Sequence, residues 1–257
     1  MSRISDLFAA KSERVLNIYY TAGFPKLEST REVLRLLQHQ GTDMVELGMP
    51  YSDPLADGPV IQDSSSQAIA NGMTIATLFQ QLKDFRTEIT LPVVLMGYMN
   101  PVMQYGFERF CADASSVGID GLILPDLPGY EFEHEYRTII EKYKLDIIFL
   151  VTPETSAERV RKLDELSTGF LYAVSSSSTT GSDKNMTVVD GYLQRLSEMN
   201  LHNPVLVGFG IKDRKSFDSA CSHANGAIIG TAFVKALGQP GTEDANVSRF
   251  FADLNIH

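Results

Sequence analysis

Short runs of apolar residues recur along the chain, and most are followed by a stretch in which apolar positions repeat with the period of a helix. Eight of these runs are rich in Val, Ile, Leu and Tyr and are too short for helices, so we predict that they form buried strands. They begin roughly 22 to 34 residues apart, the length of one strand–helix unit, except for a gap of about 50 residues between the second and the third. The predicted strands are Val15–Tyr20, Asp43–Leu47, Val93–Gly97, Gly121–Leu124, Asp146–Val151, Phe170–Ser175, Pro204–Gly208 and Gly226–Ile229.

Amphipathic segments between these strands predict an outer layer of helices. The clearest are Ser29–Gln40, Gln104–Val117, Glu131–Tyr143 and Ala157–Leu166, and a further segment, Ile4–Lys11, is expected to cover the bottom of the sheet. The alternation predicts a single α/β domain over residues 1–257, a (β/α)₈ TIM barrel with an additional N-terminal helix. A doubly wound open sheet is the alternative, but its GxGxxG sequence is missing after the first strand.

Composition limits the classes of partner. The net charge of -10 argues against nucleic acid, because such binders need Lys and Arg to displace counterions from phosphates. The chain has neither a signal peptide nor a membrane-spanning run, so we expect a cytoplasmic protein that does not bind membranes. The two cysteines, Cys111 and Cys221, lack metal-binding spacing and are expected to be buried thiols.

Glu46 is the first catalytic candidate, because it lies in the otherwise apolar strand Met44-Val45-Glu46-Leu47. In a barrel of this kind the active site forms at the C-terminal ends of the strands. Burial raises the pKa of a carboxyl group, and such a group can both donate and accept a proton in one turnover. The alternative is a buried ion pair with a distant Lys or Arg, and the residues alone leave both possibilities open.

The turn-rich segment Pro50–Pro59 supplies two more carboxylates, Asp53 and Asp57. Asp53 lies in Ser-Asp-Pro and is interpreted as a turn or helix-cap residue. For Asp57 the sequence leaves two roles open, that of a turn or helix-cap residue and that of a catalytic residue. Nothing in the spacing of Glu46, Asp53 and Asp57 favours a metal ion, so no metal site is predicted.

Glycines follow the last three predicted strands, where barrels often bind phosphate on backbone N–H groups. They are Gly181, the pair Gly208 and Gly210, and Gly230, which precedes Thr231. No His lies at the C-terminal end of a predicted strand, which argues against a nucleophilic triad. No predicted strand contains Lys, which argues against an aldolase that forms a Schiff base. Of these kinds of catalysis, proton transfer by carboxylates is the one that the sequence leaves.

The sequence ELGMPYSDPLADGP, the dipeptide Pro125-Asp126 and the glycines after the last strands resemble the tryptophan synthase alpha-subunit family over nearly the whole chain. The resemblance implies a lyase that cleaves indole-3-glycerol phosphate into indole and glyceraldehyde 3-phosphate by a retro-aldol reaction, without a cofactor. It implies that Glu46 is the general acid and base, and that Asp57 binds the indole N–H. Tyr19, Ile61, Met96, Ile123, Tyr172, Thr180 and Phe209 would bind the substrate, and Gly181, Gly210, Gly230 and Thr231 its phosphate.

The partner implied by this resemblance is the tryptophan synthase beta subunit, which carries pyridoxal phosphate, in an alpha2-beta2 heterotetramer. The Asp53 loop and the loop near Asn100-Pro101 would then serve docking. The loop after the sixth strand departs from the family, because Ser175–Ser178 lacks the usual Arg and first Gly, and Thr231 replaces a common Ser. Two other hypotheses follow: a ligand-sensing activator of the beta subunit with weak catalysis alone, or another phosphosugar barrel enzyme.

Overall fold

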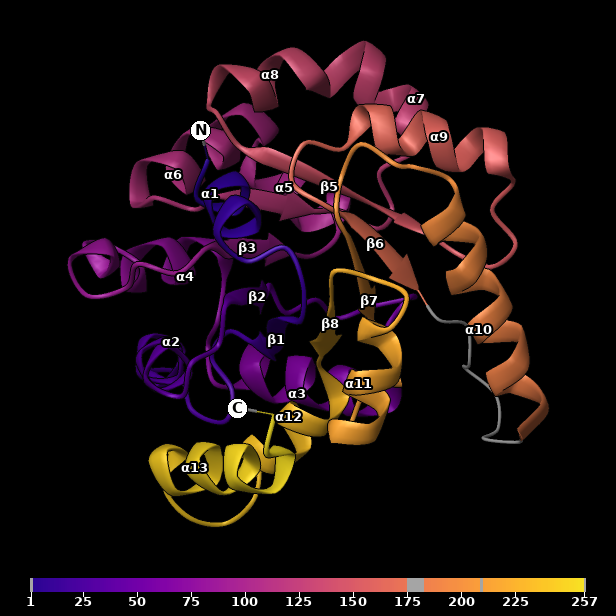
Figure 1. The fold of residues 1–257 in the computed structure, drawn as a ribbon. Coiled ribbons are helices and arrows are strands. Elements are labelled where there is room, and N and C mark those ends of the chain that lie inside the picture. The colour runs from indigo at the N-terminus through magenta and orange to yellow at the C-terminus, as the bar shows by residue number, and fades with distance from the viewer. Residues whose placement is uncertain (1, 175–182, 209, 257) are drawn as a thin grey trace.

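Eight parallel strands form a closed barrel in the computed structural model, which describes residues 2–174, 183–208 and 210–256, with the backbone alone for 183–189. The strands pair in chain order, and β8 pairs with β1 to close the barrel. They stand at the centre of the molecule with the helices around them (Figure 1). The strands are β1 (Val15–Thr21), β2 (Met44–Gly48), β3 (Val93–Met96), β4 (Gly121–Ile123), β5 (Asp146–Val151), β6 (Leu171–Val174), β7 (Val205–Gly208) and β8 (Gly226–Ile229).

Helices connect the strands and cover the outside of the barrel. Among the described residues, no helix combines the length and the apolar character that crossing a bilayer would require. The helical elements are α1 (Arg3–Ala10), α2 (Ser29–His39), α3 (Pro59–Ala70), α4 (Ile75–Gln81), η1 (Phe85–Thr87), α5 (Met99–Tyr105), α6 (Phe107–Val117), α7 (Gly129–Glu131), η2 (Phe132–Tyr136), α8 (Arg137–Lys142), α9 (Ala157–Leu166), α10 (Asp183–Glu198), α11 (Arg214–Cys221), α12 (Thr231–Leu237) and α13 (Glu243–Leu254).

The predicted barrel is confirmed, and each observed strand lies within about two residues of its predicted bounds. One helix prediction was wrong, because the segment Gln104–Val117 belongs to two helices, α5 and α6. They meet at Gly106, whose φ of 95° is outside the helical region. The long gap between β2 and β3 holds α3 and α4, to which no helix had been assigned.

The register of the strands decides which side chains share the barrel interior. Residues paired across parallel strands point to the same side of the sheet. Tyr19 of β1 is paired with Glu46 of β2, and Glu46 with Val94 of β3. All three side chains are buried. The carboxyl group of Glu46 therefore lies between an aromatic and an aliphatic side chain in the barrel interior.

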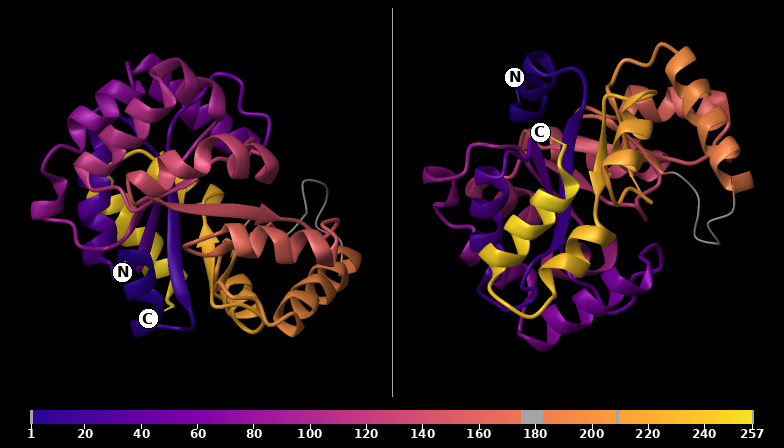
Figure 2. Two further views of the ribbon diagram at one scale, coloured as in Figure 1. Left: turned by 90° about the horizontal axis from the view of Figure 1, so that it is seen from above. Right: turned by 60° about the horizontal axis from the view of Figure 1, so that its bottom comes forward.

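Helix α1 covers the N-terminal end of the barrel, as predicted. Its Ile4 is completely buried, and Phe8 lies against Phe170 with ring centroids 6.5 Å apart. Lys11, which ends the helix, pairs with Asp43 at 2.6 Å, directly before β2. Figure 2 shows this helix at the end of the barrel where β1 begins.

Asp120 anchors the same end of the barrel from the residue before β4. Its side chain is 3% exposed and accepts hydrogen bonds from Arg86, from Arg3 Nη1 at 2.9 Å and from the backbone N–H of Val93 at 2.7 Å. The cationic partners compensate the cost of burying this carboxylate. The ion pairs therefore join α1, η1 and the start of β3, opposite the end where the candidate catalytic groups lie.

Candidate active site

Glu46 lies inside the barrel, in the middle of β2, and is completely buried. Its Oε1 accepts a hydrogen bond of 2.6 Å from Asn17 Nδ2. Burial raises the pKa of Glu46 to about 8, and the Asn17 hydrogen bond opposes this rise. The predicted burial of Glu46 is confirmed. The ion-pair alternative was wrong for the described part of the chain, since the partner is a neutral amide.

Two tyrosines line the barrel interior beside Glu46. Tyr19 of β1 is 8% exposed and Tyr172 of β6 is 4% exposed. A Cβ added to Gly48 would lie 2.2 Å from Tyr19 Oη, and one added to Gly208 would lie 2.2 Å from Tyr172 Oη. Such distances are far below van der Waals contact. The two glycines therefore leave room for the phenol rings at the mouth of the barrel.

Asp57 reaches the site from the loop between β2 and α3. Its Oδ2 accepts a hydrogen bond of 3.1 Å from the hydroxyl of Tyr98, which in turn accepts one of 3.1 Å from the Ala56 N–H. The side chain is half-buried, and desolvation raises the pKa of Asp57 while the Tyr98 hydrogen bond lowers it. Tyr98 follows β3, so two consecutive loops of the barrel mouth hold this carboxylate together.

Two other acidic residues near the barrel mouth, Asp53 and Asp126, accept local hydrogen bonds. Asp53 is exposed and accepts a hydrogen bond of 2.5 Å from the adjacent Ser52 hydroxyl. Asp126 accepts the Met99 N–H at 3.0 Å and so caps the start of α5. In residues 2–174, 183–208 and 210–256, no group of three or more His, Cys, Asp or Glu side chains is arranged to hold a metal ion.

The apolar candidates lie near Glu46. Met96 of β3 is paired with Gly48 on one side and with Ile123 of β4 on the other, so all three share the interior face of the barrel. Ile61 lies in the first turn of α3, directly after the Asp57 loop. All three apolar side chains are less than 9% exposed. These three side chains form an apolar wall on β3, β4 and the start of α3.

The glycine candidates lie after the last two strands. Gly210, with a φ of 79°, follows β7, while Gly230 precedes α12 and Thr231 is the first residue of that helix. A Cβ on Gly230 would lie 3.5 Å from Tyr19 Cβ, so the backbone at Gly230 passes close to the Tyr19 side chain. Thr180, Gly181, Phe209 and the serines of Ser175–Ser178 lie outside the described residues.

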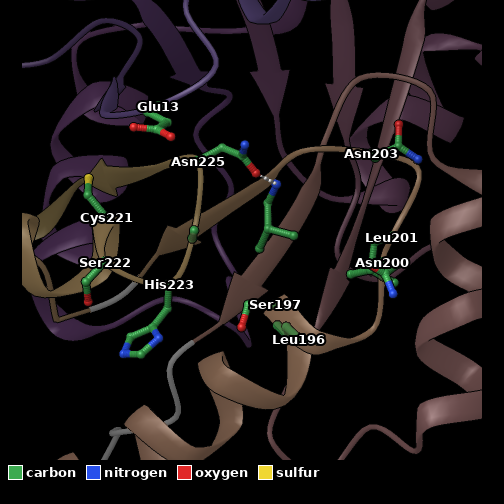
Figure 3. A pocket seen from close by; sticks show the side chains of 12 residues that line it. Glu13, Leu196, Ser197, Asn200, Leu201, Asn203, Cys221, Ser222, His223 and Asn225 are labelled. Carbon is green, nitrogen blue, oxygen red and sulfur yellow. Dashed lines mark hydrogen bonds between the residues drawn. The ribbon is translucent and has the colours of Figure 1, made fainter.

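A depression of about 530 Å³ lies at the opposite end of the barrel, before β7 and β8. Figure 3 shows Cys221 and His223 on one side of it and Asn200 and Asn203 on the other. Asn203 has a structural role there, since its Nδ2 donates to the backbone oxygens of Asp164 and Ser167. In barrels of this type the N-terminal face contributes stability rather than catalysis. We therefore assign the chemistry to the mouth that holds Glu46.

Sequence reasoning missed three residues of this site: Asn17, Gly48 and Tyr98. Asn17 carried a signal, because it is the amide in the apolar run Val15-Leu16-Asn17-Ile18. Gly48 and Tyr98 carried none, since their importance depends on which strands lie beside them.

Comparison with known proteins identifies relatives over the full length of the chain. The sequence profile of the tryptophan synthase alpha chain family matches residues 6–254. The tryptophan synthase alpha chain of Phocaeicola vulgatus is 50% identical over 240 residues, which cover 93% of each chain. Tryptophan synthase subunit alpha from Legionella pneumophila has a similar structure, with a TM-score of 0.87 and 32% identity over 99% of this chain and 96% of that one. A chain of the tryptophan synthase complex from Pyrococcus furiosus is also similar, with a TM-score of 0.85 and 33% identity over 95% and 99% of the two chains.

Proposed function

Because the chain belongs to the tryptophan synthase alpha chain family, whose reaction is the cleavage of indole-3-glycerol phosphate into indole and glyceraldehyde 3-phosphate, we propose that Glu46 and Asp57 carry out this reaction at the barrel mouth. The reaction makes the chain a lyase of tryptophan biosynthesis. The observation that carries the assignment of residues is the burial of Glu46, a carboxyl group without a cationic partner among the described residues.

Glu46 is the general acid and base. With a pKa of about 8, it is mostly protonated at neutral pH and can donate its proton to indole C3. Protonation turns the ring into a leaving group. The Glu46 carboxylate then removes the proton of the glycerol hydroxyl, the C–C bond breaks, and its electron pair returns to the indole ring as the aldehyde forms. Glu46 ends the cycle protonated, so the reaction consumes no cofactor.

Asp57 stabilises the positive charge that develops on the indole ring. Protonation at C3 makes the ring nitrogen electron-poor, and a carboxylate that accepts the N–H lowers the energy of this state. Tyr98 holds Asp57 Oδ2, which leaves Oδ1 for the ring nitrogen. The partial burial of Asp57 strengthens such an interaction, because the local dielectric is lower than that of water.

The rest of the substrate lies between the apolar wall and the glycine loops. We assign the indole ring to Tyr19, Ile61, Met96, Ile123 and Tyr172, together with Phe209 and Thr180. We assign the phosphate to the backbone N–H groups of Gly181, Gly210, Gly230 and Thr231. The closeness of Gly230 to Tyr19 supports one continuous site, because it brings a proposed phosphate contact next to a proposed ring contact.

Indole release from indole-3-glycerol phosphate tests the proposal. Glu46→Gln keeps the shape of the side chain and removes its acid–base function, so we expect kcat to fall by about 10²- to 10⁴-fold. Asp63→Asn removes an exposed carboxylate from α3 and serves as the control, with unchanged kcat. Normal turnover by the Glu46→Gln variant would rule out the role given to Glu46.

The proposed partner is a tryptophan synthase beta subunit, in an alpha2-beta2 assembly in which only the partner carries pyridoxal phosphate. Large apolar side chains are exposed beside the barrel mouth: Leu55 of the Asp57 loop is 95% exposed, and Met103 of α5 is 48% exposed. Asn100 Nδ2 donates to Tyr51 Oη at 2.9 Å and joins α5 to the loop between β2 and α3. Exposed apolar groups on linked elements are suited to docking. Indole release with and without a beta subunit would separate an independent enzyme from a subunit that mainly activates its partner.

A further inference from the structure

Asn17 is an amide in a position where packing alone would favour a hydrocarbon. It lies in the middle of β1, between Val15 and Tyr19 on the interior face of the barrel, and is completely buried. Burial of an amide is unfavourable unless its groups form hydrogen bonds. Within the described part of the chain, its Nδ2 donates to Glu46 Oε1 at 2.6 Å, while its Oδ1 has no partner. The contact with Glu46 therefore accounts for the presence of this amide.

We propose that Asn17 is a positioning residue, which holds Glu46 Oε1 through its Nδ2–H and thereby reserves Glu46 Oε2 for proton transfer to and from the substrate. The proposal rests on the function assigned to Glu46 above. Asn17 precedes Tyr19, the residue paired with Glu46, by two positions on β1, so it lies farther from the barrel mouth than Glu46 and acts through it.

The chemistry of a carboxyl group explains why one amide donor selects the oxygen. In the acid form one oxygen is a carbonyl acceptor and the other carries the proton, whereas the ionised form only accepts. An N–H donor on Oε1 suits the ionised form and the acid form with its proton on Oε2, and it opposes the acid form with its proton on Oε1. Oε2 is buried and has no hydrogen-bond partner among the described residues. The mobile proton is thus assigned to one oxygen throughout the cycle.

The groups that face Glu46 indicate that Asn17 stabilises its ionised form. Among the described residues, Tyr19 of β1 and Tyr172 of β6 are titratable groups that interact with Glu46, and burial raises the pKa of both phenols far above neutrality. Both are therefore uncharged. Asn17 is the neighbour that stabilises the ionised carboxylate against desolvation. It keeps both protonation states of Glu46 accessible near neutral pH, which a group that donates and accepts within one turnover requires.

The experiment compares the full-length wild type with Asn17→Val, since valine suits a buried strand and has no donor. Carbon-13 NMR follows the titration of the Glu46 carboxyl, whose signal is assigned by its absence from Glu46→Gln. We expect the pKa of Glu46 to rise by about 1 unit or more, because the remaining environment favours the neutral form. In indole release we expect the pH inflection to move upward by the same amount, with kcat at least about tenfold lower and KM nearly unchanged.

Asn246→Val is the matched control. Asn246 is also a buried amide with an unpaired Oδ1, and its Nδ2 donates to backbone oxygens at the end of α12, Leu237 O at 3.2 Å and Gln239 O at 2.7 Å. Its substitution removes these two structural hydrogen bonds but should leave the titration of Glu46 unchanged. A purely structural role of Asn17 would make the two variants behave alike.

An unchanged or lowered pKa of Glu46 in Asn17→Val would overturn the proposal, because the amide would then not stabilise the carboxylate. If Asn17→Val does not fold, Asn17→Asp provides a variant of the same shape. It replaces the donor with oxygen and should raise the pKa of Glu46 as well. The NMR titration needs no turnover, so it remains informative if the wild type releases no indole, a result that would refute the proposed reaction instead.

Discussion

Gly48→Ala offers a stringent test of the barrel mouth, because it adds one methyl group at a point of very close contact. The new Cβ would lie 2.2 Å from Tyr19 Oη, 2.6 Å from Cζ and 2.8 Å from Cε2. A small rotation cannot relieve contacts this short with the hydroxyl oxygen and two ring carbons, and Tyr19 is 8% exposed with little free space. Overpacking of a buried site costs about 1–3 kcal/mol, and we expect a loss of this size in the free energy of unfolding.

The same displacement should impair catalysis, since Tyr19 is paired with Glu46 and lines the proposed indole site. A shift of about 1 Å in a reacting group can reduce the rate on the order of 10²-fold, so we expect a comparable fall in kcat/KM. Combining Gly48→Ala with Tyr19→Phe should recover only part of the stability. This change removes the closest atom, but the atoms at 2.6 and 2.8 Å remain.

Gly191→Ala is the control for the Gly48→Ala variant. Gly191 lies within α10, where an added Cβ would meet nothing within 4 Å. Alanine in a helix stabilises by about 0.5–1 kcal/mol relative to glycine, so the control should move in the opposite direction. Urea unfolding and indole release measure both quantities. Stability and kcat/KM at wild-type level in the Gly48→Ala variant would refute the steric argument.

Two further predictions concern stability. Burial raises the pKa of Glu46 to about 8 from 4.5, so the folded state keeps this proton longer than the unfolded chain, and stability is lost as the pH rises from about 4.5 to about 8. In urea unfolding, the stability of Glu46→Gln relative to wild type should therefore be a few kcal/mol greater at about pH 9 than at about pH 5, and a difference that does not vary with pH would contradict the assignment. At the other end of the barrel, Asp120→Ala leaves Arg86, whose side chain is 15% exposed, without its carboxylate partner and should cost about 3–5 kcal/mol. Arg3→Ala removes a partner that is 46% exposed and should cost at most about 1 kcal/mol, so equal losses would show that burial does not decide the energy.

Much of the barrel could be predicted from local pattern. The strands were found because each buried run is apolar and each following helix has its own period. The break between α5 and α6 was missed because the apolar periodicity continues on both sides of Gly106, and the change of direction depends on the φ of one glycine. α3 and α4 were missed because the weak amphipathic pattern of this region predicts no helix clearly.

By itself, the sequence determined the alternation of strands and helices, the family, and the position of a carboxyl group within an apolar strand. These features depend on local periodicity and on contiguous motifs. Only the tertiary structure decided that Glu46 is paired with Asn17 rather than with a cation, and that Tyr98 holds Asp57 from 41 residues away. Closure of the barrel sets the register between strands, and the register determines which interior side chains share a layer. No local pattern carries that information, because each of these contacts joins elements that are separate in the sequence.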